Sequence, residues 1–504
     1  MSTRLSTSAL KTLSSHIPVP KYSRTKPAAI VHVGVGNFCR AHLFENTHKY
    51  NQNCKGNEWL IHGVGVLNNS SEREAFKKME SSEYLYGLLT LPSKSAEIIG
   101  SMCSYDWVPN SAASLENAVQ ALSSPDSRII SLTITEKGYC TDTNGNIDFE
   151  NADLMHDVQT LKGGDRASSF KTALGLVVEG LSRRQEANAG PITILSCDNL
   201  PSNGDALRSI LSELISATRP ELLEYTTNQV TFPNSMVDRI TPGVTDDTVR
   251  LFEAETNVFD PLPVVAEDFT QWVVEDNFIA GRPKWEAVEE NNILFVDDCE
   301  PYEAMKLGLL NASHTAMAYV SILAGHEKVD QSMGDEDVYN FVKTYMDMAT
   351  STVPDVPGVD LEEYKETLRY RFCNLSDDLS RLAQDGSKKM IGFVLPSLVI
   401  KLENGESTEQ IAGVVASWIC YLNQFPDLVD DPRSAELIDL GKLVVESCSR
   451  PCDGEAGEAT RTFVHATLGG LTGTSEQFMA QIEEHVYDIQ TKGAESLLKK
   501  SFSS

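Results

Sequence analysis

The sequence predicts an α/β protein: an N-terminal domain built on a parallel sheet with helices on both faces, followed by a mainly α-helical C-terminal domain. Two observations lead to this prediction. Short apolar runs typical of buried strands alternate with helical segments through the first half of the chain. From about residue 300 onward only helical patterns follow. With 504 residues the chain is long enough for two domains, which we place at residues 1–295 and 296–504.

A strand, a glycine turn and a helix open the N-terminal domain. The apolar residues 28–33 are typical of a buried parallel strand, Gly34-x-Gly36 follows, and residues 38–50 are compatible with a helix. The first glycine permits a tight bend, and the second lets the backbone approach a pyrophosphate at the helix N-terminus. The pattern therefore predicts an extended Rossmann-like domain that binds a dinucleotide. We expect its cofactor contacts from Val33, Gly34, Val35, Gly36, Asn37, Phe38 and Arg40.

The turn differs from the usual dinucleotide-binding pattern of three glycines at position 39, and a positively charged residue follows at position 40. Cys39 replaces the third glycine, and its side chain is small enough for close packing of the helix on the strand. Arg40 offers a positive charge for a phosphate. Because a glycine pair after a strand is often only a turn, the prediction of nucleotide binding depends on the strand, the helix and Arg40 together.

The alternation of strands and helices continues beyond this turn. Further strands are expected at residues 59–67, 128–139 and 192–200, with helices at 114–124 and 169–184. Strand-like segments at 84–92 and 96–108 suggest a β insertion. Ligands of such folds bind at the carboxyl ends of the strands. This rule places Lys137 and Asn199 in a predicted binding site, although each side chain also suits a polar loop cap.

The residue after the second strand bears on the choice of cofactor. NAD enzymes place an acid there to bind the adenosine ribose 2′-hydroxyl, but this chain has Asn68. An asparagine can hydrogen-bond a hydroxyl without repelling a 2′-phosphate. We therefore expect NAD as the cofactor, with measurable activity with NADP.

The second half of the chain contains a series of amphipathic or apolar segments typical of helices. We expect helices at residues 302–325, 337–349, 361–372, 379–390, 405–425 and 474–500. No internal repeat and no long Gly/Ser linker separates the two halves. The domain boundary is therefore predicted only from the change from alternating strands and helices to helices alone.

Three polar residues interrupt the apolar helix expected at 302–325. On an α-helix Lys306 and His314 lie about 80° apart and Asn311 and His314 about 60° apart, so all three fit one face. Each residue alone could be a core residue whose polar groups are hydrogen-bonded. The three together favour a ligand-binding site, because burying a polar helix face without hydrogen-bond partners costs free energy. Burial lowers the pKa of a lysine from about 10.4 towards the working pH, which makes Lys306 a candidate general base for an alcohol.

The spacing Lys306-x4-Asn311-x2-His314 resembles the catalytic signature of the polyol-specific long-chain dehydrogenases/reductases. The segment GVGNFCRAH at 34–42 is similar to the family's cofactor motif. Further segments resemble those of the family in the same order, at residues 135–139, 197–204, 232–242, 265–276 and 371–389. The resemblance covers nearly the whole chain. Its departures are Cys39, where many members have His, and Asn68 at the acid position.

The resemblance implies a metal-free hydride transfer between a polyol carbon and NAD(P). Lys306 corresponds to the general acid/base, Asn199 and Asn311 to the pair that donates hydrogen bonds to the reacting oxygen, and His314 to a contact with a substrate hydroxyl. Asp238, Arg381 and Lys389 correspond to further substrate contacts. A monomeric enzyme is also implied. Two alternatives stay open: a relative acting on arabinitol or a sugar acid such as fructuronate or tagaturonate, and a nucleotide-sensing protein without catalysis.

The composition of the chain excludes some classes of binding partner and indicates a cellular compartment. A net charge of −30, from 72 acidic and 42 basic residues, repels nucleic acid and anionic membranes. Ten cysteines without a C-x-x-C pair indicate reduced thiols and a cytoplasmic protein. The N-terminal 27 residues lack acids, as in transit peptides, but their three prolines oppose a long amphipathic helix. No metal-binding motif and no membrane span is present in the sequence, so we expect neither.

Overall fold

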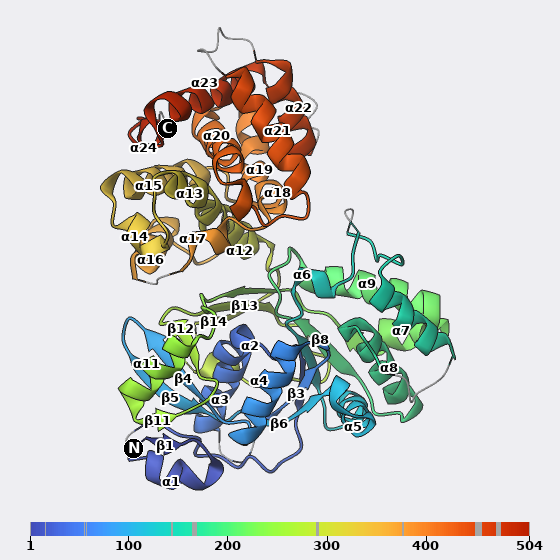
Figure 1. Ribbon diagram of the computed structural model, residues 1–504. Coiled ribbons are helices and arrows are strands. Elements are labelled where there is room, and N and C mark those ends of the chain that lie inside the picture. Colours follow the sequence, from blue (N-terminus) through green and yellow to red (C-terminus); the bar gives the residue numbers. More distant parts are fainter. Residues whose placement is uncertain are drawn as a thin grey trace. The chain divides into compact units, whose positions relative to one another are not determined.

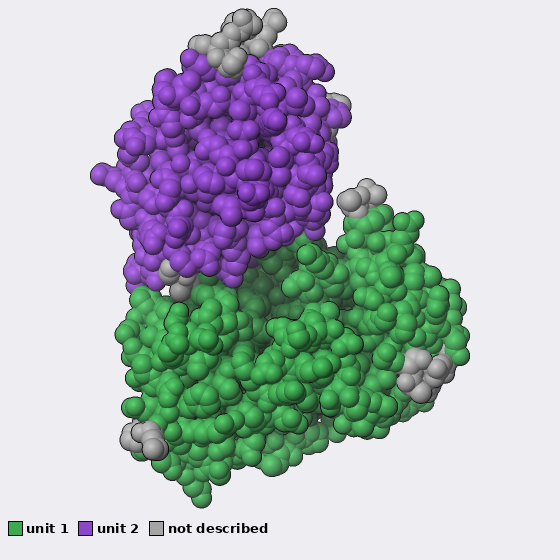
Figure 2. All heavy atoms as spheres, in the orientation of Figure 1, with its two compact units in different colours: residues 1–300 green, residues 301–504 purple. Residues whose placement is uncertain are grey.

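The computed structural model (Figure 1) describes residues 2–15, 17–54, 56, 58–142, 145–163, 169–288, 292–374, 377–448, 456–469 and 475–502. The chain forms two compact units, residues 1–300 and 301–504, here called unit 1 and unit 2 (Figure 2). Their division lies next to the predicted boundary at 295 and 296. Unit 1 contains a Rossmann-like parallel sheet and unit 2 is helical, which confirms the predicted fold class.

Six parallel strands form the main sheet of unit 1, in the order β6-β3-β2-β7-β8-β9. In chain order they are β2 (Ile30–Val33), β3 (Ile61–Gly65), β6 (Met102–Trp107), β7 (Ile129–Leu132), β8 (Ile192–Ser196) and β9 (Val230–Thr231). The order reverses between β2 and β7. In open sheets of this kind, ligands bind at the carboxyl ends of the strands at such a reversal.

Helices cover both faces of this sheet because alternate strand residues point to opposite sides. Val31 and Val33 pack into a core with residues of α5 (Ala112–Ser123), α7 (Ala152–Gly163), α8 (Ala173–Glu186) and α9 (Asn203–Thr218). Ile30, which precedes Val31 and points to the opposite side of the sheet, packs with residues of α3 (Leu43–Asn53) and α4 (Ser70–Ser81). Burial on both sides explains why most residues of the central strands are apolar.

Smaller sheets complete unit 1. One joins β4 (Tyr86–Leu91), β5 (Ser95–Ile99) and β12 (Val264–Glu267); a second joins β10 (Ser235–Asp238), β13 (Gln271–Glu275) and β14 (Ile293–Val296); a third pairs β1 (Thr3–Arg4) with β11 (Val258–Phe259). The predicted β insertion at 84–92 and 96–108 is wrong in part. Residues 84–92 and 96–99 do contribute to β4 and β5, but residues 102–107 form β6, the edge strand of the main sheet.

The segment at 128–139 also differs from its prediction as one strand. The strand ends at Leu132, and Thr135–Gly138 form the short helix α6. Thr135 has a φ of 60°, and the backbone N–H groups of Ile134 and Thr135 donate to Asp198 instead of extending the sheet. The expected helix at 38–50 is likewise divided, into α2 (Asn37–Ala41) and α3, with His42 at the break. Unit 1 further contains α1 (Leu10–Leu13), α10 (Leu223–Gln229) and α11 (Asp246–Thr256).

Unit 2 is built around α20 (Glu409–Gln424), which is buried along most of its length. It packs against α13 (Ala312–Leu323), α21 (Ser434–Ser447) and α23 (Glu476–Lys492). The other α-helices are α12 (Glu300–Met305), α14 (Val329–Met333), α15 (Glu336–Thr350), α16 (Leu361–Asn374), α17 (Leu379–Leu382), α18 (Gly386–Lys389), α19 (Leu395–Asn404), α22 (Glu458–Thr467) and α24 (Glu495–Leu498).

Two π-helices interrupt this α-helical pattern: η6 (Lys306–Asn311) joins α12 to α13, and η7 (Met390–Val394) joins α18 to α19. They pack against each other. The predicted single helix at 379–390 is instead broken, because Asp385 adopts a left-handed conformation with a φ of 51° between α17 and α18. None of the helices in the described part of the chain combines the length and apolar character that a membrane crossing requires. The nine described cysteines form no disulfide with one another, and Cys452 lies outside the described residues.

Candidate active site

The glycine turn joins β2 to α2, and the space beside Gly36, where a ligand is expected, is open. Gly34 has a φ of +93°, and a Cβ added there would lie 2.2 Å from the carbonyl oxygen of Thr133, so only glycine fits. Gly36 is exposed, and an added Cβ would meet no heavy atom within 4 Å. The Gly36 N–H donates to Cys39 Sγ at 3.2 Å, and Cys39 is buried, as predicted for a substitute of the third glycine.

A buried histidine of β2, His32, contacts the glycine turn through hydrogen bonds. His32 Nε2 lies 3.1 Å from the Gly34 carbonyl oxygen and 3.0 Å from Thr133 Oγ1, and its Nδ1 lies 2.8 Å from Ser131 Oγ. Burial lowers the pKa of His32 to about 3, so its ring is neutral at ordinary pH. A neutral ring donates from one nitrogen and accepts at the other, which matches these neighbours.

Arg40 is enclosed in the fold. Its Nε donates to the Gly36 carbonyl oxygen at 3.2 Å, its Nη1 to that of Leu262 at 2.7 Å, and its Nη2 to Asn37 Oδ1 at 2.7 Å. The guanidinium also lies over the ring of Tyr86, and burial lowers its pKa. Arg40 therefore fixes the shape of the turn, while the predicted contact of Arg40 with a phosphate stays a prediction. Val33 and Val35 are buried, and Asn37 and Phe38 are half-buried.

Asp198 connects the loops that follow β7 and β8. It accepts hydrogen bonds from the N–H groups of Ile134 (3.1 Å) and Thr135 (2.8 Å) and from the Tyr139 hydroxyl (3.0 Å). Burial raises its pKa, which these donors oppose. The two loops carry the predicted site residues Lys137 and Asn199, both exposed. The sequence prediction missed Asp198, although its place directly after an apolar strand marks it as a site position.

Asn203 connects the same loop to β10, which ends at Asp238. Its Nδ2 donates to the carbonyl oxygens of Asp198 (2.9 Å) and Ser235 (2.8 Å), and its Oδ1 accepts from the Ser235 N–H at 2.9 Å. Asn203 is fully buried and was also missed in the sequence. The predicted substrate residue Asp238 is itself buried, and its backbone pairs with Gln271 of β13.

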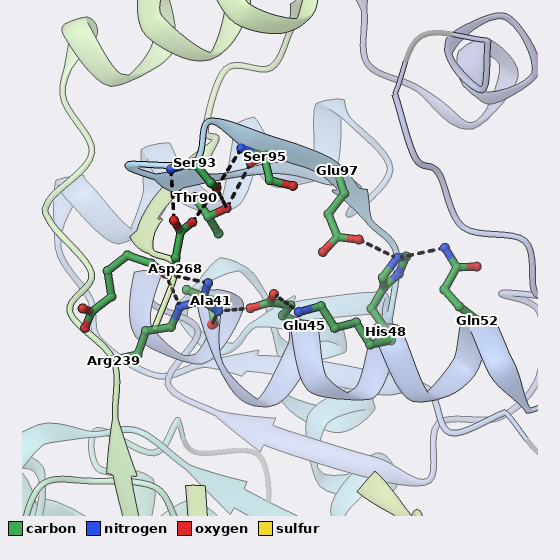
Figure 3. Close-up of polar contacts among 12 residues, drawn as sticks. Ala41, Glu45, His48, Gln52, Thr90, Ser93, Ser95, Glu97, Arg239 and Asp268 are labelled. Atoms are coloured by element: carbon green, nitrogen blue, oxygen red, sulfur yellow. Dashed lines mark hydrogen bonds and ion pairs between the residues drawn. The ribbon is translucent and has the colours of Figure 1, made fainter. Parts of the chain in front are cut away.

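The residue after Asp238 ties this edge to α3 (Figure 3). Arg239 donates to the Ala41 carbonyl oxygen at 2.5 Å, to the Glu267 carbonyl oxygen at 2.9 Å, and to the carboxylate of Glu45, with which it forms a buried ion pair. Glu45 is also paired with Lys49 at 2.7 Å. The helix that follows the glycine turn is therefore held to the strand that carries Asp238.

Asn68 lies just beyond β3 and is exposed, as a ribose contact requires. Asn69 begins α4, since its side chain accepts a hydrogen bond from the Glu72 N–H at 2.8 Å. The nearest carboxylate in sequence is thus Glu72, and burial raises its pKa. No carboxylate occupies position 68 or 69 to repel a 2′-phosphate.

In unit 2 the predicted catalytic pair Lys306 and Asn311 occupies the two ends of the π-helix η6. Both side chains are buried, with exposed fractions of 7% and 8%. The Ala312 N–H donates to the Leu307 carbonyl oxygen, five residues back. The wider turn of this hydrogen-bond pattern brings residues five apart closer in angle than an α-helix does. The α-helical angles assumed for this segment are therefore wrong, and the shared face of the two residues stays a prediction.

The other predicted residues of unit 2 are His314, Arg381 and Lys389. The His314 ring stacks on Phe372, with ring centroids 4.2 Å apart. Lys389 ends α18, directly before η7, and its Nζ donates to the Leu382 carbonyl oxygen at 2.8 Å. Arg381 is exposed and forms an ion pair with Asp377. Arg381 lies on α17 and Lys389 on α18. Both helices pack against α13, which carries His314.

The residues present fit a dinucleotide. The exposed Gly36, open on its ligand side, provides the backbone approach that a pyrophosphate needs. Among the described residues no cluster of His, Cys, Asp or Glu is arranged to hold a metal ion. A parallel sheet with this turn, together with a helical unit carrying a buried lysine and asparagine, defines a two-domain dinucleotide-dependent dehydrogenase.

Comparison with known proteins gives the family. Residues 28–287 match the model of the mannitol dehydrogenase Rossmann domain, and residues 298–439 match that of the mannitol dehydrogenase C-terminal domain. The chain therefore belongs to the mannitol dehydrogenase family and is a polyol dehydrogenase.

Individual relatives agree along most of their length. A mannitol dehydrogenase of Saccharomyces cerevisiae is 35% identical over 86% of this chain and 87% of its own. A polyol:NADP oxidoreductase of Gluconobacter oxydans is 35% identical over 81% of this chain and 83% of its own. The solved structure of Pseudomonas fluorescens mannitol 2-dehydrogenase, a ternary complex with NAD and D-mannitol, is similar with a TM-score of 0.84, at 33% identity and with 99% of each chain covered.

Proposed function

We propose that this polyol dehydrogenase interconverts D-mannitol and D-fructose with NAD, and that it also accepts NADP. Similarity to the mannitol 2-dehydrogenase that was solved with NAD and D-mannitol supports the substrate and the cofactor. Similarity to a polyol:NADP oxidoreductase supports the second cofactor. We further propose that the enzyme works as a cytoplasmic monomer and without a metal ion.

The observation that carries this proposal is the buried Lys306 at the start of η6, with Asn311 at its end. Burial disfavours the charged ammonium, so the amine can accept the proton of an alcohol. The chemistry that bound NAD supplies is acceptance of a hydride from the carbinol carbon. In the reverse direction the protonated Lys306 returns a proton to the oxygen of the ketose.

The remaining residues bind and orient. Asn199 and Asn311 donate hydrogen bonds to the reacting oxygen, where negative charge develops. His314, Asp238, Arg381 and Lys389 contact the other hydroxyls of the substrate. The proposed cofactor contacts are Val33, Gly34, Val35, Gly36, Asn37, Phe38, Arg40, Asn68 and Lys137.

The test is the pH–rate profile of Lys306→Ala in the full chain. Polyol oxidation by the wild type should fall as pH decreases, because Lys306 becomes protonated, and ketose reduction should fall as pH increases. The variant should lose about 10²–10⁴-fold in turnover, the range for a positioned acid/base. Its affinity for the cofactor should persist. Lys442→Ala is the matched control, since the Lys442 side chain is 63% exposed and removal of its charge should leave turnover unchanged.

Near wild-type turnover of Lys306→Ala, with the same pH dependence, would make Lys306 a structural residue. The substrate is tested in parallel by oxidation of NADH and NADPH with fructose, fructuronate, tagaturonate and xylulose. Fructose should be preferred. A preference for either sugar acid would instead assign Arg381 and Lys389 to a carboxylate.

A further inference from the structure

A surface pocket of about 340 Å³ lies in unit 1 along helix α4. It is lined by Arg73, Phe76, Lys77 and Glu80 of α4 and by Trp107, Pro109 and Asn110 at the end of β6. Because β6 runs parallel to β3, with Trp107 paired to Gly65, this end of the pocket is at the carboxyl ends of the strands. Leu67 and Asn68 follow the same end of β3.

Hydrogen bonds join the pocket to Leu67 and Asn69, the two residues that flank the proposed ribose contact Asn68. Trp107 Nε1 donates to the Leu67 carbonyl oxygen at 3.0 Å. The Arg73 N–H donates to the Asn69 carbonyl oxygen at 3.2 Å, so Arg73 lies one turn inside the helix that Asn69 begins. The Leu67 side chain is 60% exposed, and it offers an apolar surface beside Asn68 on which an adenosine can rest.

The pocket presents two cations without acidic partners. Arg73 and Lys77 are four residues apart on one face of α4, both are exposed, and neither forms an ion pair with any described residue. The Arg73 guanidinium lies over the Trp107 ring, 5.4 Å from its centroid. Such stacking holds the flat group in place and leaves its N–H edge for a ligand. Glu80 is the one acid in the lining, so the pocket carries two positive charges against one negative.

These cations stand out in a chain of 72 acidic and 42 basic residues. Several other exposed cations of the described residues pair with an acid, as Lys343 does with Asp347 and Lys492 with Asp488. A doubly charged phosphate monoester is the ligand that an arginine fork beside a lysine binds best. No carboxylate at positions 68 and 69 opposes it.

We propose that Arg73, assisted by Lys77, binds the 2′-phosphate of NADP and so determines how well this enzyme uses NADP. The assignment rests on the proposed function, because it places the adenosine ribose beside Asn68. Asn68 then contacts the ribose itself, while the phosphate occupies the pocket between Arg73 and Lys77. Trp107 acts as the platform that positions the guanidinium.

The test measures binding of two cofactor fragments to the full chain by calorimetry: adenosine 2′,5′-bisphosphate and 5′-AMP. The wild type should bind the bisphosphate at least about tenfold more tightly than 5′-AMP. Arg73→Ala should abolish most of this preference, Arg73→Lys should keep part of it, and Lys77→Ala should reduce it by a smaller factor. All variants should bind 5′-AMP as the wild type does. Lys78→Ala removes the same charge from the same helix outside the pocket, and it should change neither affinity.

Kinetics supply a second readout. The ratio of kcat/KM for NADPH to that for NADH should fall in Arg73→Ala through a higher KM for NADPH, with kcat retained. Equal binding of the two fragments by the wild type, or an unchanged preference in Arg73→Ala, would overturn the inference. A protein that turns over no polyol with either cofactor, yet keeps the preference for the 2′-phosphate, would contradict the proposed function and leave this assignment standing.

Discussion

Gly34 and Gly36 lie two residues apart in one turn, but different constraints require glycine at each. At Gly34 the constraint is internal, because the φ of +93° and the Thr133 carbonyl oxygen exclude a Cβ. At Gly36 the backbone has an ordinary φ of −114° and open space around it. No contact among the described residues requires glycine at this position, so the constraint that we propose there is the approach of a ligand to the backbone. We therefore expect a substitution at Gly34 to affect folding and a substitution at Gly36 to affect ligand binding.

We predict that Gly34→Ala lowers the stability of the fold, whereas Gly36→Ala leaves stability within about 0.5 kcal/mol of the wild type. The first should cost at least about 1–3 kcal/mol through backbone strain and the clash. The second should weaken NADH binding tenfold or more, since a methyl group would occupy the place of the pyrophosphate. Thermal unfolding and a fluorescence titration with NADH measure the two effects. Wild-type affinity in Gly36→Ala would show that the pyrophosphate does not bind at this turn.

The bend at Gly34 could be predicted from the sequence because its constraint is local: a strand, a bend and a helix within a few residues. The burial of Arg40 could not. One of its acceptors is the carbonyl oxygen of Leu262, 222 residues away, and its aromatic platform is Tyr86 on a separate sheet. A charge beside a glycine turn is typical of a phosphate contact, and nothing nearby in the sequence signals the distant partners that enclose it.

At the scale of elements, Arg239 and Glu45 connect α3, the second helix after the glycine turn, to the strand that ends at Asp238 (Figure 3). Their side chains are only 2% and 3% exposed. Removing one partner from such a pair leaves an uncompensated buried charge, which is far more costly than losing a surface pair. This connection therefore ties the proposed substrate contact to the cofactor turn.

We predict that Glu45→Gln destabilises the protein by about 3–5 kcal/mol, because the guanidinium of Arg239 stays buried without its carboxylate. It should also raise the KM for the polyol, since Asp238 is the neighbour of Arg239. Denaturant unfolding and steady-state kinetics give the two values. The control is Glu436→Gln, which breaks the exposed pair with Arg433 and should cost less than about 1 kcal/mol. Equal losses in both variants would show that the buried pair does not hold the two elements together.

The π-helices show where element prediction from sequence fails. On an α-helix, residues five apart such as Lys306 and Asn311 lie about 140° apart, at the two edges of one broad face. The wider turn of a π-helix reduces this angle. Hydrophobic periodicity over six residues cannot distinguish the two forms, and the packing of η6 against η7 joins segments more than 80 residues apart in the chain. The burial of the two residues could be predicted, while the π-helix that carries them could not.

At the scale of the whole molecule, the sequence showed the order of the two parts and their classes, since a change from alternating strands and helices to helices alone needs no tertiary information. The extent of burial was harder to predict. Five of the ten histidines lie in the interior with pKa values lowered mainly by burial, to about 3 for His32, His42 and His48 and to about 4 for His62 and His485. Four of them belong to unit 1.

These histidines determine how stability depends on pH near neutrality. A histidine that is neutral in the fold takes up a proton on unfolding once the pH is below about 6.5, so stability falls as pH falls. Buried carboxyls act in the opposite direction. Burial raises the pKa of Asp260 to about 6, so the folded Asp260 takes up a proton before the unfolded one does, and this offsets part of the loss below that value. The histidines therefore determine most of the slope between about pH 7 and 6, where at most half of Asp260 is protonated.

We predict that the free energy of unfolding decreases as pH is lowered from about 7 to 6 and that His485→Phe makes this decrease smaller. His485 Nε2 has no hydrogen-bond partner among the described residues, and its ring lies near Phe502, so phenylalanine suits the site. One histidine contributes a slope that approaches about 1.4 kcal/mol per pH unit below its unfolded pKa. Denaturant unfolding at several pH values, in about 0.2 M salt to screen the net charge of −30, gives the slopes. Stability that rises over this range, or identical slopes for the two proteins, would mean that the buried histidines are already protonated in the fold.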